Sequence, residues 1–95
     1  MFDEENESAE KQKNARELEL LTIRNLMQTE NGRLFMWRCL QNCSTFENIF
    51  NSDTVLHAHS SGKRSHGLWL DEELREAAPD SYYQMLKENR WRNDY

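Results

Sequence analysis

The sequence contains almost none of the residues that interrupt helices. Among its 95 residues there are one proline and three glycines. These two residue types are the least favourable inside a helix, by about 3 and about 1 kcal/mol relative to alanine. No segment shows the alternation of apolar and polar residues, bounded by turn residues, that predicts a strand. We therefore expect an all-α chain.

Apolar spacing and capping residues together predict where the helices begin and end. Thr29 is placed to cap a second helix, and Asp53 or Thr54 is placed to cap a third. Pro79 fits the first turn of a last helix. The expected fold is a small bundle of about four helices with a long polar N-terminal helix or arm. The expected helices cover about residues 5–27, 29–43, 55–77 and 79–91.

Composition divides this single domain into three segments. Residues 1–16 are an acidic arm or helix extension, since five acids lie in the first ten residues. Residues 17–90 are the helical domain, and residues 91–95 are an aromatic tail. Because the arm has no apolar stripe to bury, the sequence is compatible with either an ordered helix or a disordered segment there.

Two segments, 31–40 and 62–70, combine glycine, basic residues and tryptophan. We expect them to form the main helix contacts. Gly62 and Gly67 fall inside a predicted helix, where each costs about 1 kcal/mol. We therefore expect either a helix break at residues 60–62 or the close approach of another backbone. The expected helix-contact and core residues are Gly32, Phe35, Trp37, Gly62, Gly67, Leu68 and Trp69.

Binding to another protein has the strongest physical support among the classes of function. A short chain with 37% hydrophobic residues buries a limited core. Docking onto a larger protein, or formation of a homo-oligomer, would supply the missing buried surface. Tryptophan, tyrosine and arginine dominate the energetics of such interfaces. The candidates for partner docking are Arg33, Arg64, Tyr82, Tyr83, Trp91 and Tyr95.

A metal site is not expected. The two cysteines, Cys39 and Cys43, are four residues apart and lack the usual Cys-x-x-Cys spacing of zinc sites. His57 and His59, two apart on a helix, point to different faces. We therefore expect free thiols and no metal or cofactor. A zinc-dependent DNA-binding regulator stays an alternative function, which metal analysis of the purified protein would test.

Enzymatic, nucleic-acid and membrane functions are also not expected. The chain contains neither a nucleophile-elbow motif nor a glycine-rich phosphate loop. Its net charge of −5 argues against general nucleic-acid binding, which needs a cationic surface. No apolar stretch approaches the ~20 residues of a membrane span.

Three motifs follow one another in an order that resembles a known family. They are a threonine-capped Gly-Arg-x-Phe-x-Trp helix, a helix with Gly-x-Arg and then Gly-Leu, and a helix opening with Pro-x-x-Tyr-x-x-Met. The matching residues are Thr29, Gly32, Arg33, Phe35, Trp37, Gly62, Arg64, Gly67, Leu68, Pro79, Tyr82 and Met85. Over about residues 18–89 the chain resembles small proteins and domains encoded by short-tailed bacteriophages (podoviruses), typified in a Bordetella phage. It has Ser60-Ser61 where that family tends to carry an asparagine–glutamate pair.

The resemblance implies a phage protein encoded near head and portal genes, with no established enzymatic activity. It implies a virion-associated or assembly protein that docks to the portal, the head–tail connector or the internal core. Its location would be the virion and, during assembly, the host cytoplasm. Gly32 and Gly62 would then mark close helix approaches, with Trp37 and Trp69 packed around them. The alternative is a small intracellular phage effector that binds a host protein.

Overall fold

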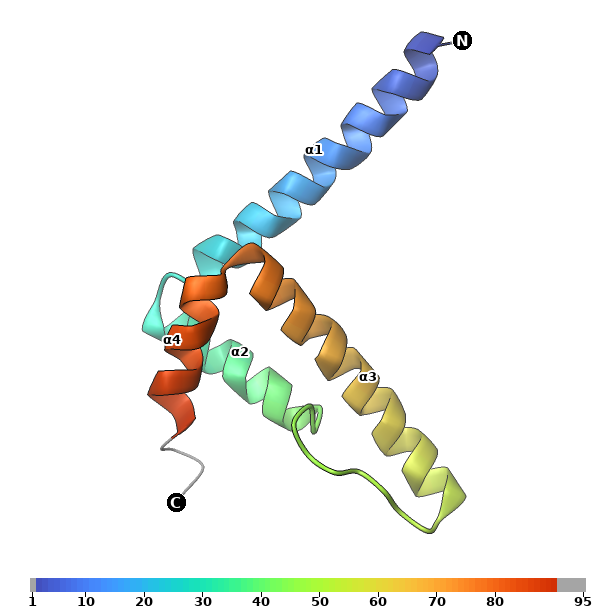
Figure 1. Ribbon diagram of the computed structural model, residues 1–95, viewed down its shortest axis with the longest axis vertical. Coiled ribbons are helices and arrows are strands. Elements are labelled where there is room, and N and C mark those ends of the chain that lie inside the picture. The colour runs from blue at the N-terminus through green and yellow to red at the C-terminus, as the bar shows by residue number, and fades with distance from the viewer. Residues whose placement is uncertain (1, 91–95) are drawn as a thin grey trace.

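The computed structural model describes the backbone of residues 2–90 and the side chains of residues 4–90. Within that part, all regular structure is helical and no strand occurs. The helices are α1 (Phe2–Leu26), α2 (Glu30–Asn42), α3 (Thr54–Ala77) and α4 (Pro79–Asn89), as drawn in Figure 1. The prediction of an all-α fold of about four helices with a long N-terminal helix is confirmed.

The helices begin at the residues whose side chains can cap them. Thr29 caps α2, because its Oγ1 accepts a hydrogen bond from the Gly32 N–H at 3.0 Å. Asp53 rather than Thr54 caps α3, with Oδ1 accepting from two backbone N–H groups at 2.9 and 3.1 Å. Pro79 opens α4. The second helix ends at Asn42, and Ser44 then turns the chain with a φ of 55°.

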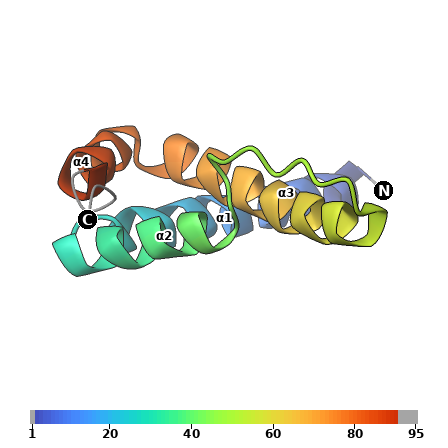
Figure 2. The ribbon, with the colours of Figure 1, turned by 90° about the horizontal axis from the view of Figure 1, so that it is seen from below.

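The molecule is a thin, open V rather than a rounded bundle. α1 and α3 diverge from a corner where residues 23–27 meet residues 74–78, and α2 and α4 lie beside that corner (Figure 1). Figure 2 shows how flat the arrangement is. The extents are 55 × 36 × 15 Å and the radius of gyration is 17.2 Å. A compact domain of this length would have a radius of about 12 Å.

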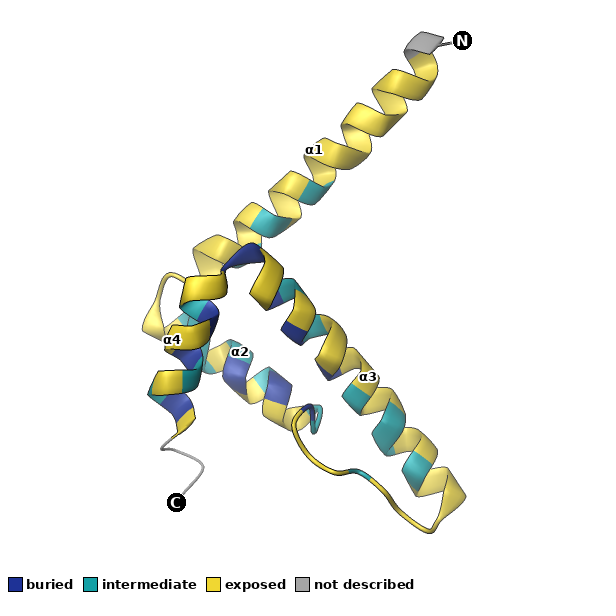
Figure 3. Ribbon diagram, viewed as in Figure 1, coloured by how far each residue is buried: buried dark blue, intermediate teal, exposed yellow. Residues whose placement is uncertain are grey.

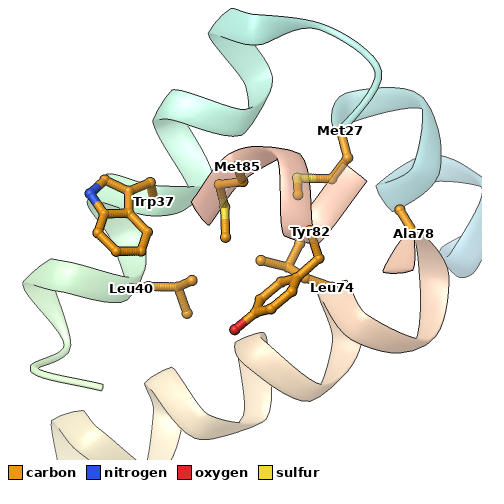
Figure 4. Close-up of a cluster of buried hydrophobic side chains, with 7 residues drawn as sticks. All are labelled: Met27, Trp37, Leu40, Leu74, Ala78, Tyr82 and Met85. Atoms are coloured by element: carbon orange, nitrogen blue, oxygen red, sulfur yellow. The ribbon is translucent and has the colours of Figure 1, made fainter. Parts of the chain in front are cut away.

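The hydrophobic core lies at the corner and between α2, α3 and α4. Figure 4 shows its members converging from the end of α1 and from the other three helices. Ile23, Met36, Leu70 and Leu86 pack around them and are partly buried. The buried cluster consists of Met27, Trp37, Leu40, Leu74, Ala78, Tyr82 and Met85.

Both arms of the V are largely exposed, as the yellow ribbon of Figure 3 shows. Residues 4–15 of α1 are all exposed. In α3 the buried residues begin only at Gly67. Stable packing is therefore confined to the corner and the α2–α4 side of the molecule.

The prediction for Gly62 is wrong. α3 runs without a break through residues 60–62. A Cβ added at Gly62 would meet no described atom within 4 Å, so no backbone approaches there either. The close approach lies one and a half turns later. At Gly67 an added Cβ would lie 2.0 Å from Thr45 Oγ1 and 2.7 Å from Cys43 Cβ.

Gly32 is also tightly enclosed, but by the preceding turn rather than by another helix. An added Cβ would lie 1.8 Å from the carbonyl oxygen of Leu26. The helix approaches expected at Gly32 and Gly62 are thus replaced by a local turn at Gly32 and by contact of α3, at Gly67, with the turn after α2.

The predicted core residues divide according to helix face. Trp37 and Gly67 are buried, whereas Phe35 is 60% and Trp69 53% exposed. Residues two apart on a helix point in nearly opposite directions. Phe35 therefore faces away when Trp37 is buried, and Trp69 faces away when Gly67 and Asp71 are buried. Leu68, at 39% exposed, lies at the edge of the buried face.

Candidate protein-docking groove

An open hollow of about 780 Å³ lies between the end of α2 with the turn after it, α3 and α4. We call it the groove. Its apolar part comes from Trp37, Phe46 and Leu86, and its cationic part from Arg75 and Arg90. Tyr82, Thr45 and Glu47 are among the other lining residues.

Trp37 and Phe46 form the aromatic wall of the groove. Their rings are stacked, with centroids 6.0 Å apart and planes inclined by 25°. Trp37 is 7% exposed, whereas Phe46 is 53% exposed. The Trp37 Nε1–H is buried and has no hydrogen-bond partner among the described residues. Buried indole N–H groups are usually hydrogen-bonded, so Trp37 is an exception to that rule.

The opposite wall is built on a polar cluster of three side chains. Tyr82 donates its hydroxyl proton to Asp71 Oδ1 at 2.6 Å. Arg75 donates through Nε to Asp71 Oδ2 at 2.8 Å and through Nη2 to the Tyr82 hydroxyl at 3.0 Å. Its guanidinium carbon lies 4.6 Å from the centroid of the Tyr82 ring. Asp71 is only 7% exposed, and the two donors satisfy its buried charge.

This cluster holds both ionisable donors in their protonated forms. Burial, and the hydrogen bond to Asp71, raise the pKa of Tyr82 to about 12. The hydrogen bond to Asp71 likewise raises the pKa of Arg75. At neutral pH Tyr82 is thus a hydrogen-bond donor rather than a base, and Arg75 keeps its positive charge at the groove. These properties suit recognition of an anionic group better than proton transfer.

Ion pairs at the edges of the fold hold the helices that carry the groove. Arg33 pairs with Glu88 on α4 and donates to the Met27 carbonyl oxygen at 3.0 Å. Arg16 on α1 pairs with two acids of α3, Glu73 at 2.8 Å and Glu76 at 2.7 Å. Partly exposed pairs of this kind each contribute about 0–1 kcal/mol, so they orient the helices more than they stabilise them.

The residues predicted for partner docking have different environments. Arg33 is engaged within the chain, and Tyr82 is 1% exposed, so neither offers a free side chain to a partner. Tyr83 is 59% exposed. Arg64 is partly buried, and its Nε has no hydrogen-bond partner among the described residues. Trp91 and Tyr95 lie outside the described residues.

Sequence reasoning named Trp37 and Tyr82 but missed other residues that shape the groove. Phe46 lies in a turn, and Asp71, Arg75 and Arg90 lie among many other charges. The one available signal was the four-residue spacing of Asp71 and Arg75, which places opposite charges together on a helix. Nothing in the sequence indicates that Tyr82, from the next helix, completes that pair.

The thiols and imidazoles do not gather. Cys39 and Cys43 are free and partly buried. Among residues 4–90, no three histidine, cysteine, aspartate or glutamate side chains are placed to hold a metal ion. Over the same residues, no helix has the length and apolar character to cross a membrane.

Comparisons with protein-family models, curated proteins and solved structures gave no match to this chain.

Proposed function

We propose that this chain is a non-enzymatic docking module that binds a segment of another protein in the groove. The observation that carries the proposal is the stacked aromatic wall of Trp37 and Phe46 in the same groove as the guanidinium groups of Arg75 and Arg90. The segment that fits has an apolar or aromatic side chain that packs against Phe46. It also has a carboxylate that pairs with Arg75 and Arg90. Aromatic anchors and arginine are the groups that most often dominate such interfaces.

The biological setting that we propose is a short-tailed phage. The chain would be a virion-associated or assembly protein that docks to the portal, the head–tail connector or the internal core. Its support is the resemblance in the order of the Gly32, Gly62 and Pro79 motifs. In the alternative, the same groove serves a small intracellular effector that binds a host protein.

Mass spectrometry of purified particles, from the phage whose genome encodes the chain, separates these two settings. A stoichiometric copy number supports the virion role, and absence from the particles eliminates it in favour of the effector. Phe46→Ser and Arg90→Glu should each lower incorporation, whereas Phe50→Ser should not. Phe50 is the matched control because it is 78% exposed and does not line the groove. Normal incorporation of both groove variants would refute docking through the groove.

A further inference from the structure

The folded chain exposes much more surface than a compact protein of its mass. Its accessible surface is 7473 Å² for 11.4 kDa. A compact monomer of that mass would expose about 5,800 Å². The excess of about 1,700 Å² is twice the ~800 Å² that each partner contributes to a standard protein interface. The V therefore has ample surface for a stable dimer.

Apolar side chains interrupt the polar surface of both arms on the part nearer the corner. On α1, Leu18 and Leu21 are 64% and 46% exposed. They lie away from the face that carries Ile23 and Met27 into the core. On α3, Trp69 is 53% exposed, and its ring lies against that of its helical neighbour His66, with centroids 5.3 Å apart. These side chains are large enough to anchor an interface.

Farther from the corner the two arms carry opposite charge. Residues 4–10 of α1 are all exposed and contain four glutamates and no basic residue. Residues 54–70 of α3 contain Lys63, Arg64 and three histidines and no acid. From the corner outward, each arm thus carries exposed apolar side chains and then a charged segment, which is acidic on α1 beyond Lys11 and Lys13 and basic on α3. Complementary potentials of this kind guide partners and set their register.

We propose that a second copy of this chain covers the arms, with α1 of each protomer packed along α3 of the other. A two-fold axis parallel to the bisector of the V, and lying beside its flat face, exchanges the two arms, so it stacks α1 of one copy on α3 of its partner. Both helices then run outward from the corner, which brings Leu18 and Leu21 near the partner's Trp69. The acidic segment of α1 comes to lie on the partner's basic segment. The contact is closed by symmetry and occurs twice.

This dimer uses the arms and leaves the groove free, so it does not depend on the proposed docking function. A chain that dimerises and fails to enter particles would refute the function alone. A chain that enters particles as a monomer would refute the dimer alone.

Sedimentation velocity of the full chain over a range of concentrations tests the proposal. We expect a reversible monomer–dimer equilibrium in the micromolar range. Leu18→Ser and Trp69→Ser should each raise the dissociation constant at least tenfold with helicity retained. Phe35→Ser is the matched control, because Phe35 is equally exposed but lies on α2. A chain that stays monomeric at all concentrations would overturn the proposal, as would weakening by the control and not by the arm variants.

A charge exchange tests which helices pair. Glu10→Lys and Lys63→Glu should each weaken the dimer about two- to fivefold, the range expected for exposed ion pairs. A chain that carries both changes should regain the wild-type affinity, because the altered α1 of each protomer then lies against the altered α3 of its partner. Additive weakening in the double variant would rule out the α1–α3 arrangement.

Discussion

The two glycines of α3 give a paired test of how the chain packs. Gly62→Ala and Gly67→Ala make the same change in the same helix. Both gain about 1 kcal/mol of helix propensity. The alanine methyl at position 62 enters open space. At position 67 it would lie 2.0 Å from Thr45 Oγ1, well inside contact distance. We therefore expect the two substitutions to change stability in opposite directions.

The size of the loss at Gly67 follows from what must move. Thr45 is 1% exposed, and its hydroxyl donates to the Leu40 carbonyl oxygen at 2.8 Å. Cys43 Cβ blocks the other side at 2.7 Å. Overpacking costs about 1–3 kcal/mol, and losing a buried hydrogen bond costs about 1 kcal/mol more. After the gain in propensity, we expect Gly67→Ala to lower the free energy of unfolding by about 2 kcal/mol.

Urea unfolding followed by circular dichroism at 222 nm measures both variants. Dilute protein keeps self-association from contributing. Gly62→Ala should raise the free energy of unfolding by about 1 kcal/mol, which for a domain of this size raises Tm by about 4–8 °C. If Gly67→Ala proves as stable as the wild type, α3 does not pack on the turn after α2 as the structure has it. A destabilised Gly62→Ala would show that position 62 is enclosed.

Three further predictions concern single interactions. Tyr82→Phe removes the donor to Asp71 and should lower the free energy of unfolding by about 1–2 kcal/mol in urea titrations, whereas unchanged stability would mean that the hydrogen bond contributes nothing. Because folding raises the pKa of Tyr82 from 10.0 to about 12, its contribution is complete below pH 10 and is lost as the pH rises through 12. Between pH 9 and pH 12 the free energy of unfolding should therefore fall more for the wild type than for Tyr82→Phe. An equal fall in the two proteins would contradict the raised pKa. Thr29→Ala should lower the melting temperature by the equivalent of about 1 kcal/mol through loss of the α2 cap, with Thr29→Ser close to the wild type.

The helices were predictable because their signals are local. Thr29, Asp53 and Pro79 act on backbone groups within three residues of themselves, so their roles can be inferred without the rest of the chain. The scarcity of glycine and proline excluded frequent breaks in the same way. The groove was not predictable, because Trp37, Phe46, Asp71 and Tyr82 come from four different segments. Their meeting depends on how those segments pack.

By itself the sequence determined an all-α chain, its caps and the polar character of the first arm, since each rests on short-range hydrogen bonding or on residues that cannot be buried. Only the tertiary structure decided which face of each helix is covered. It turned Trp37 inward and Phe35 and Trp69 outward, and it placed the tight contact at Gly67 rather than at Gly62. The reason is that a helix forms its backbone hydrogen bonds within itself, whereas its apolar stripe is buried only when another helix packs against it. The arrangement of the helices around the corner sets which side chains find such a partner and leaves the two arms open.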